Sequence, residues 1–148
     1  MRDKVKTLLA NKIETLTGIK PIFNVHKVPR ELNKEILFVR LDNVTRDTAD
    51  VIDIYTFEVY YAYKVVSKDE DVQIKTFDIA QKIQQLNGEN EYITDDEGQM
   101  QQIVFWLVDE DYTEDYSETI GVVVEGRFLI RAYISNKYVG GWKLWVVY

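Results

Sequence analysis

The stretch that decides the fold is Ile52–Leu86, IDIYTFEVYYAYKVVSKDEDVQIKTFDIAQKIQQL. Its first half alternates with the two-residue period of a β-strand, so successive side chains point to opposite faces. One face carries apolar and aromatic residues, namely Tyr55, Phe57, Val59, Tyr61, Tyr63 and Val65. The other carries Thr56, Glu58, Tyr60, Ala62 and Lys64. The pattern predicts an unusually long strand with one apolar and one more polar face.

After a polar turn the apolar period lengthens to that of a helix, about 3.6 residues. The expected apolar stripe comprises Val72, Thr76, Ile79, Ala80, Ile83 and Leu86. This stripe can lie back on the apolar face of the strand, with Ile83 against Tyr61. A long strand followed directly by an amphipathic helix predicts the core of an α+β domain.

Upstream of this unit the sequence predicts a helix and two strands. Val5, Leu8, Leu9, Ile13 and Leu16 recur at helical spacing, with Gly18 as the expected cap and Pro21 preventing continuation. Strands are expected at Ile22–Val28 and Ile36–Leu41, and a polar connection at Asp42–Asp50. The second of these strands should pair antiparallel with the long one.

Downstream, Gly88 is the expected cap of the second helix, and Glu89–Gly98 is an expected polar linker. The remaining predicted elements are a strand at Met100–Val108, an acidic loop at Asp109–Glu118, strands at Thr119–Val124 and Arg127–Ser135 joined by a Glu125–Gly126 turn, and a last strand at Trp142–Tyr148. The predicted fold is α+β: a mixed, mostly antiparallel sheet with two amphipathic helices packed on it. Nothing divides residues 1–148, so one domain is expected.

Composition narrows the possible partners. The 148 residues are 46% hydrophobic and carry a net charge of −7 at pH 7, without cysteine. The negative charge argues against duplex DNA or an anionic membrane as the main partner. The sequence has neither an apolar run long enough for a membrane span nor the pattern of a signal peptide. We therefore expect a soluble, intracellular protein.

Catalytic and cofactor motifs are missing from the sequence. His26 is the single histidine, so it cannot form a multi-histidine metal site within one subunit. No serine stands in a nucleophile elbow, and neither of the common glycine-rich phosphate loops occurs. The sequence therefore predicts no enzyme and no cofactor.

The acidic stretch is the candidate for a metal site. Its carboxylates are Asp109, Glu110, Asp111, Glu114, Asp115 and Glu118. They are hard oxygen ligands of the kind that Ca²⁺ and Mg²⁺ prefer, but the spacing of an EF-hand is absent. A solvated acidic surface is the expectation, with no metal bound.

Aromatic residues suggest a protein contact. A sheet with only two helices cannot bury large rings on both faces, and Tyr and Trp are enriched at interface hot spots. The candidate oligomer or partner interface comprises Tyr60, Trp106, Trp142, Trp145 and Tyr148.

Two segments carry a resemblance to a known family. They are VKTLLANKIETLTGIKP (Val5–Pro21) and YTFEVYYAYKVVSKDEDVQIKTFDIAQKIQQLNG (Tyr55–Gly88). Their order of elements resembles the tail terminator and tail-completion (head–tail joining) proteins of long-tailed bacteriophages and phage-tail-like particles. The resemblance implies a structural virion protein, assembled in the host bacterial cytoplasm. It also implies a hexameric ring that contacts tail tube and neck proteins, without sequence-specific nucleic-acid binding. In such a ring the acidic stretch Asp109–Glu118 is expected to face the lumen or a neighbouring ring. The aromatic C-terminal stretch departs from that family.

Two other functions stay open at this point. One is a monomeric assembly or binding module from the same kind of gene cluster, which the mass of the purified protein would distinguish from a ring. The other is a small metal-dependent enzyme that uses the acidic stretch, which a metal titration would test.

Overall fold

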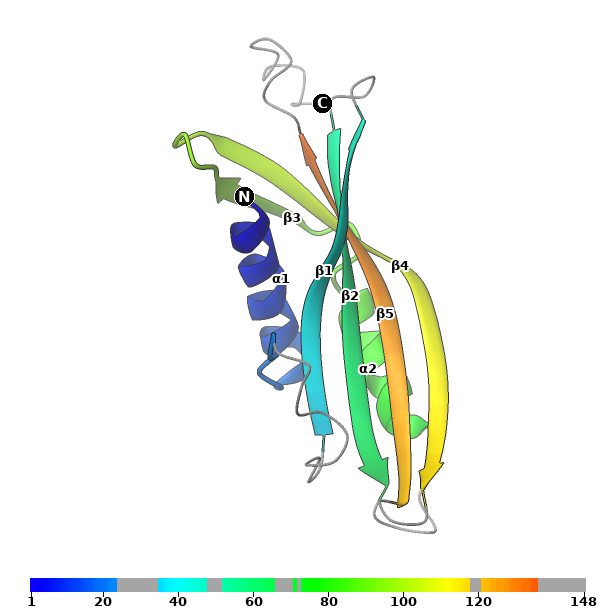
Figure 1. Ribbon diagram of the computed structural model, residues 1–148. Helices are drawn as coiled ribbons and strands as arrows, with labels where there is room; N and C mark the ends of the chain where they lie inside the picture. The colour runs from blue at the N-terminus through cyan, green and yellow to red at the C-terminus, as the bar shows by residue number, and fades with distance from the viewer. Residues whose placement is uncertain (24–34, 48–51, 66–70, 72, 118–120, 136–148) are drawn as a thin grey trace.

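The computed structural model describes residues 1–23, 35–47, 52–65, 71, 73–117 and 121–135. Within these ranges the chain forms two helices and five strands (Figure 1). In chain order they are α1 (Arg2–Thr17), β1 (Glu35–Asp47), β2 (Ile52–Val65), α2 (Ile74–Gln84), β3 (Asn90–Thr94), β4 (Met100–Ser117) and β5 (Gly121–Ser135). The strands form one antiparallel sheet in the order β1-β2-β5-β4-β3. The predicted α+β class is confirmed.

Strand β2 is central, as its sequence predicts. It pairs antiparallel with β1 on one side, which confirms the predicted hairpin, and with β5 on the other. Its odd-numbered residues from Tyr55 to Tyr63 are buried in the main hydrophobic core. Their neighbours on the same face include Leu37 and Val39 of β1 and Phe128 and Ile130 of β5. The alternation therefore identifies the core face correctly.

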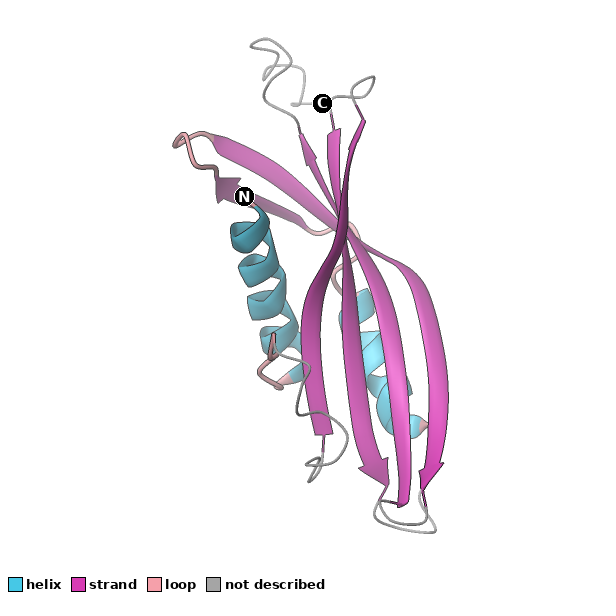
Figure 2. Ribbon diagram, viewed as in Figure 1, coloured by secondary structure: helices cyan, strands magenta, loops and turns pink. Residues whose placement is uncertain are grey.

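Both helices pack on this one face of the sheet. Their buried residues, Val5, Leu9 and Ile13 of α1 and Ile79 and Ile83 of α2, belong to the same core as β2. Helix α1 contacts β1, and α2 contacts β2, β4 and β5 (Figures 1 and 2). Neither helix of the described part of the chain combines the length and apolarity needed to span a membrane.

The helix ends follow local chemistry. Gly18 caps α1 as predicted: it has φ 77°, and its N–H donates to the carbonyl oxygen of Glu14 at 2.8 Å. Helix α2 begins at Ile74, and Val72, the first residue of the predicted stripe, lies outside the described residues. The C-cap of α2 is Gln85, so the expectation that Gly88 caps it is wrong. Gly88 lies further on, where its N–H donates to the Phe105 carbonyl oxygen at 3.0 Å.

The second face of β2 differs from the prediction. Thr56, Tyr60 and Ala62 are buried, although the alternation assigned them to the polar face. Tyr60 and Ala62 form a smaller apolar cluster with Phe38 and Val123. The adjacent strands supply these apolar neighbours, and periodicity within a single strand contains no information about them.

The described part of the first strand candidate forms an isolated bridge. Ile22 pairs in parallel with Phe38, and its N–H donates to the Leu37 carbonyl oxygen at 2.9 Å. Residues 24–28 of the predicted Ile22–Val28 strand lie outside the described residues.

Two stretches interpreted as polar connections contain strands. Strand β1 continues from the predicted Ile36–Leu41 through Asp47, so the first part of the Asp42–Asp50 connection is wrong. A register shift between Leu41 and Asn43 lets the pairing with β2 resume at Asn43 opposite Thr56. The predicted linker Glu89–Gly98 contains β3, which pairs with the beginning of β4.

Strand β5 runs without interruption through the predicted Glu125–Gly126 turn, so that turn is wrong. Among the described glycines, those with positive φ are Gly18, Gly88 and Gly98, and Gly126 is not one of them. A Cβ at Gly126 would lie 2.9 Å from Cζ of Phe128. Glycine is therefore needed here for close packing and not for a reversal of the chain.

Candidate functional site

The acidic stretch is the second half of a strand. The structure places Asp109–Ser117 in β4, paired with β5, so the expectation of an acidic loop is wrong for these residues. Asp109 and Asp111 lie opposite Leu129 and Arg127. The carboxylates are therefore distributed along a strand, with neighbours on alternate faces, and do not converge as ligands in a loop would.

This half of β4 is an edge of the described sheet. Strand β3 pairs with β4 only as far as Val104, whereas β5 pairs with it to Ser117 (Figure 1). Asp109, Glu110, Asp111 and Glu114 are exposed along it. On the helix side, Oε1 of Glu110 accepts a hydrogen bond from Nε2 of Gln84 at 3.2 Å. Charged side chains on an edge strand prevent indiscriminate pairing with other chains.

A pair of aromatic rings, Phe77 exposed and Tyr112 partly buried, lies beside the edge. The rings of Phe77 on α2 and Tyr112 on β4 meet edge to face, with centroids 5.3 Å apart. Tyr112 in turn contacts the buried ring of Phe128 at 6.1 Å. Helical periodicity does not identify Phe77 as a surface residue of interest, because Phe77 lies off the apolar stripe of α2. An aromatic residue outside that stripe was the available signal.

Of the predicted interface residues, Trp106 has an accessible side chain. The exposed fraction of Trp106 is 44%. Its ring packs so closely on the backbone of Gly88 that a Cβ added to this glycine would lie 3.5 Å from the ring. Trp142, Trp145 and Tyr148 lie outside the described residues, as do Glu118 and His26. Asp115 lies within β4, but its side chain is not described.

Tyr60 is buried, with an exposed fraction of 7%, so it offers little surface to a partner. Its ring stacks on Phe38 with centroids 4.7 Å apart, and the guanidinium of Arg127 lies 5.8 Å from the ring centroid. Glu58 is ion-paired with Arg40 and lies 3.9 Å from Nε of Arg127. These contacts support a structural role for Tyr60, whose ring stabilises this face of the sheet.

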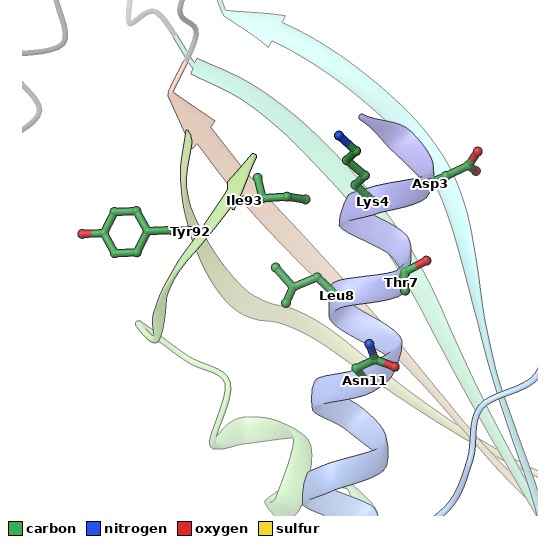
Figure 3. A pocket seen from close by; sticks show the side chains of 7 residues that line it. All are labelled: Asp3, Lys4, Thr7, Leu8, Asn11, Tyr92 and Ile93. Atoms are coloured by element: carbon green, nitrogen blue, oxygen red, sulfur yellow. The ribbon is translucent and has the colours of Figure 1, made fainter. Parts of the chain in front are cut away.

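A groove of about 390 Å³ lies between α1 and β3. It is lined by Asp3, Lys4, Thr7, Leu8, Asn11, Tyr92 and Ile93 (Figure 3). Leu8 and Ile93 point toward each other across it, while the ring of Tyr92 points away (Figure 3). Nζ of Lys4 donates to the Thr94 carbonyl oxygen at 2.9 Å, which secures one end. The groove has a mixed lining and no catalytic constellation of the described side chains.

No three His, Cys, Asp or Glu side chains gather as a potential metal site among the residues that the structure describes. A partly exposed ion-pair cluster joins α1 to the start of β3 and the residue before it. Lys12 bonds to both Glu89 and Glu91. Burial alone would lower the pKa of Lys12, but the two carboxylates raise it above its ordinary value. This cluster serves to dock the helix.

Three tyrosines have raised pKa values. Burial is the main cause for each, and a neighbouring carboxylate adds to it: Asp53 for Tyr55, Glu35 for Tyr61 and Glu110 for Tyr112. The hydroxyl of Tyr61 donates to Oε2 of Glu35 at 2.7 Å. Ionisation would leave two negative charges facing each other in that contact.

Stability is therefore expected to fall as the pH rises above about 10, where tyrosines of the unfolded chain lose their protons. Because the folded pKa values are higher, the contribution is fully present below pH 10 and is lost above it. Urea unfolding at increasing pH, with tyrosinate absorbance followed in parallel, measures this. Tyr61→Phe should reduce the pH dependence. Ordinary titration of all ten tyrosines in the folded protein would contradict it.

In comparisons with known proteins, no family model and no curated sequence matches the chain.

Proposed function

We propose that this chain is a structural protein of a phage tail or phage-tail-like particle, whose subunits form a ring that terminates the tail tube and joins it to the neck. The observation that carries the proposal is the order and arrangement of elements. An N-terminal helix, a long tyrosine-rich strand and the helix that follows it share one hydrophobic core, with both helices packed on the same face of the sheet. This is the order by which the sequence resembles tail terminators.

Two surface features support the proposal. A ring requires two different contact surfaces on each subunit. The half-exposed indole of Trp106 is a suitable anchor for one of them, because large rigid rings contribute much interface area. The acidic residues of β4 suit a protein that DNA passes without being bound, since carboxylates repel phosphates within a Debye length of about 8 Å.

Native mass spectrometry and electron microscopy of the purified protein test the ring, alone and with tail tubes. A ring, expected to be hexameric, should form at least on the tubes, and Trp106→Ala should weaken it without lowering the melting temperature. Met100→Ala removes a still more exposed apolar side chain and serves as the control. A monomer under all these conditions would favour the alternative, a monomeric assembly module.

Particles made without this protein give the decisive result. They should have tails of abnormal length that do not join to heads, so infectious or active particles should be lost. Particles of normal length and full activity would end the proposal.

A further inference from the structure

Strand β3 does not extend along the second half of β4, so no strand of the described sheet pairs with its outer edge. Hydrogen bonds fix which of its residues point outward. The N–H of Asp95 donates to the Gln99 carbonyl oxygen at 2.8 Å, and that of Gly88 donates to the Phe105 carbonyl oxygen. In an antiparallel strand, alternate residues direct both backbone groups to the same neighbour. Odd-numbered residues of β4 therefore face β3 up to Leu107.

The irregularity between Leu107 and Asp109 reverses this alternation. Beyond it, Asp109, Asp111 and Thr113 direct their backbone groups to β5. The outward residues are Glu110, Tyr112 and Glu114. In agreement, the N–H of Glu110 bonds locally to Oδ1 of Asp109 at 3.0 Å. We call Glu110–Glu114 the open edge.

The open edge is flanked by an apolar shelf, formed by Ile74, Phe77 and Tyr112. Ile74 and Phe77 lie one turn apart on α2, and their exposed fractions are 54% and 45%. The Phe77 ring contacts the Tyr112 ring, so the shelf lies on the helix face of the sheet, directly beside the outward backbone groups of Tyr112. A helix beside an open strand edge provides the geometry for adding a peptide strand, with pockets or shelves for its side chains.

Charge identifies the occupant. The open edge and its neighbour Asp109 carry four exposed carboxylates, and Arg127 is the one cation opposite them in the described register. Pairing with the open edge of a second copy would bring like charges together. Strand β1 of a second copy is a poor alternative. Ile22 occupies its outer edge at Leu37 and Val39, and Arg40 and Arg46 are already paired with Glu58 and Asp53.

We propose that the open edge binds a basic, extended segment of another protein as an added antiparallel strand. A leucine or similar side chain opposite Tyr112 would rest on the shelf. Lysines or arginines opposite Glu110 and Asp111 would pair with their carboxylates. The proposal goes beyond ring formation and does not depend on it.

The probe is the peptide acetyl-Thr-Lys-Thr-Leu-Lys-Lys-Thr-amide, which has this pattern in antiparallel register. Its binding should slow amide hydrogen exchange at Tyr112 and Glu114, and leave Asp111 and Thr113, which β5 already protects, unchanged. The same peptide with an N-methylated leucine keeps its charge but loses the central donor. Its affinity should fall about tenfold, as expected for one lost backbone bond and the added bulk.

Protein variants separate backbone pairing from charge attraction. Glu114→Pro removes an outward N–H and should abolish binding, whereas Glu114→Gln keeps the N–H and should weaken binding less. Glu14→Gln, an exposed acid on α1, is the matched control and should bind like the original protein. If Glu114→Pro does not fold, the two peptides on the unaltered chain still decide.

Equal affinity for the two peptides, or protection spread over other acidic surfaces, would mean charge attraction alone and overturn the proposal. Absence of binding would show that the carboxylates merely protect the edge. Sedimentation that reveals self-association, lost in Glu114→Pro, would identify a second copy as the occupant and overturn it as well.

Discussion

Ile83→Ala is expected to lower the free energy of unfolding by about 2–5 kcal/mol, the usual range for truncating a buried isoleucine. Ile83 is fully buried in the core that joins α2 to the sheet, a core that also contains Tyr61. The core lies between one helix layer and one sheet face, so a cavity there removes contacts from both. Urea unfolding, with the slope checked for two-state behaviour, measures the change.

Ile74→Ala is the matched control on the same helix. Ile74 is more than half exposed, so its truncation should change stability by no more than about 0.5 kcal/mol. Ile83→Asp should prevent folding, because it would bury an unpaired charge. An unchanged melting temperature for Ile83→Asp would show that the face assigned to α2 is wrong.

Strand β2 and helix α2 could be predicted because the apolar residues follow the two-residue period of a strand and then the 3.6-residue period of a helix. Tyr55, Phe57, Val59 and Tyr61 alternate without a break, and Ile79 and Ile83 continue the stripe on the helix. Each residue contributes a large apolar area, so burial of one face outweighs local preferences. The same argument explains why the antiparallel pairing of β1 with β2 was predicted correctly, because two apolar strands close in sequence pair most readily.

The lengths of β1 and β4 could not be predicted from composition. Asp and Asn disfavour strands, so DNVTRD and DEDYTEDYS are typical of loops. The neighbouring strands override this preference: β2 extends beside β1, and β5 extends beside β4, each supplying backbone partners. Glu110, Tyr112 and Glu114 recur at the two-residue spacing of one strand face, and this spacing was the available signal. The many acidic residues of the stretch obscured it.

The candidate site was predicted in part. Trp106 and four of the acidic residues, Asp109, Glu110, Asp111 and Glu114, are exposed, as an interaction surface requires, but the strand geometry of the acids was missed. Tyr60 was placed on an open face because its neighbours in sequence, Glu58 and Lys64, are charged. Phe38, Ala62 and Val123 bury it from adjacent strands. Cross-strand neighbours depend on register, which one chain's periodicity does not specify.

Thr113→Pro and Glu114→Pro form a pair that tests the geometry of β4 directly, with the second-largest effect expected here. The N–H of Thr113 points to β5, opposite Glu125, so proline there removes a ladder bond and leaves a carbonyl unpaired. We expect a loss of about 3 kcal/mol. Proline is tolerated on edge strands where the N–H faces outward, so Glu114→Pro should cost about 1 kcal/mol or less.

Two controls isolate the backbone effect in this pair. Oγ1 of Thr113 donates to Oε2 of Glu125 at 3.1 Å, so Thr113→Ala measures the loss of that exposed bond alone. Glu114→Gln measures the loss of the charge. Urea unfolding of the four variants should therefore show one large loss, at Thr113→Pro. Equal, small effects of the two prolines would mean that Asp109–Ser117 is a loop after all, and would remove the open edge together with the strand. A large loss at Glu114→Pro and a small one at Thr113→Pro would mean that the alternation after Leu107 is reversed, because the amides facing β5 would then be those of the even-numbered residues.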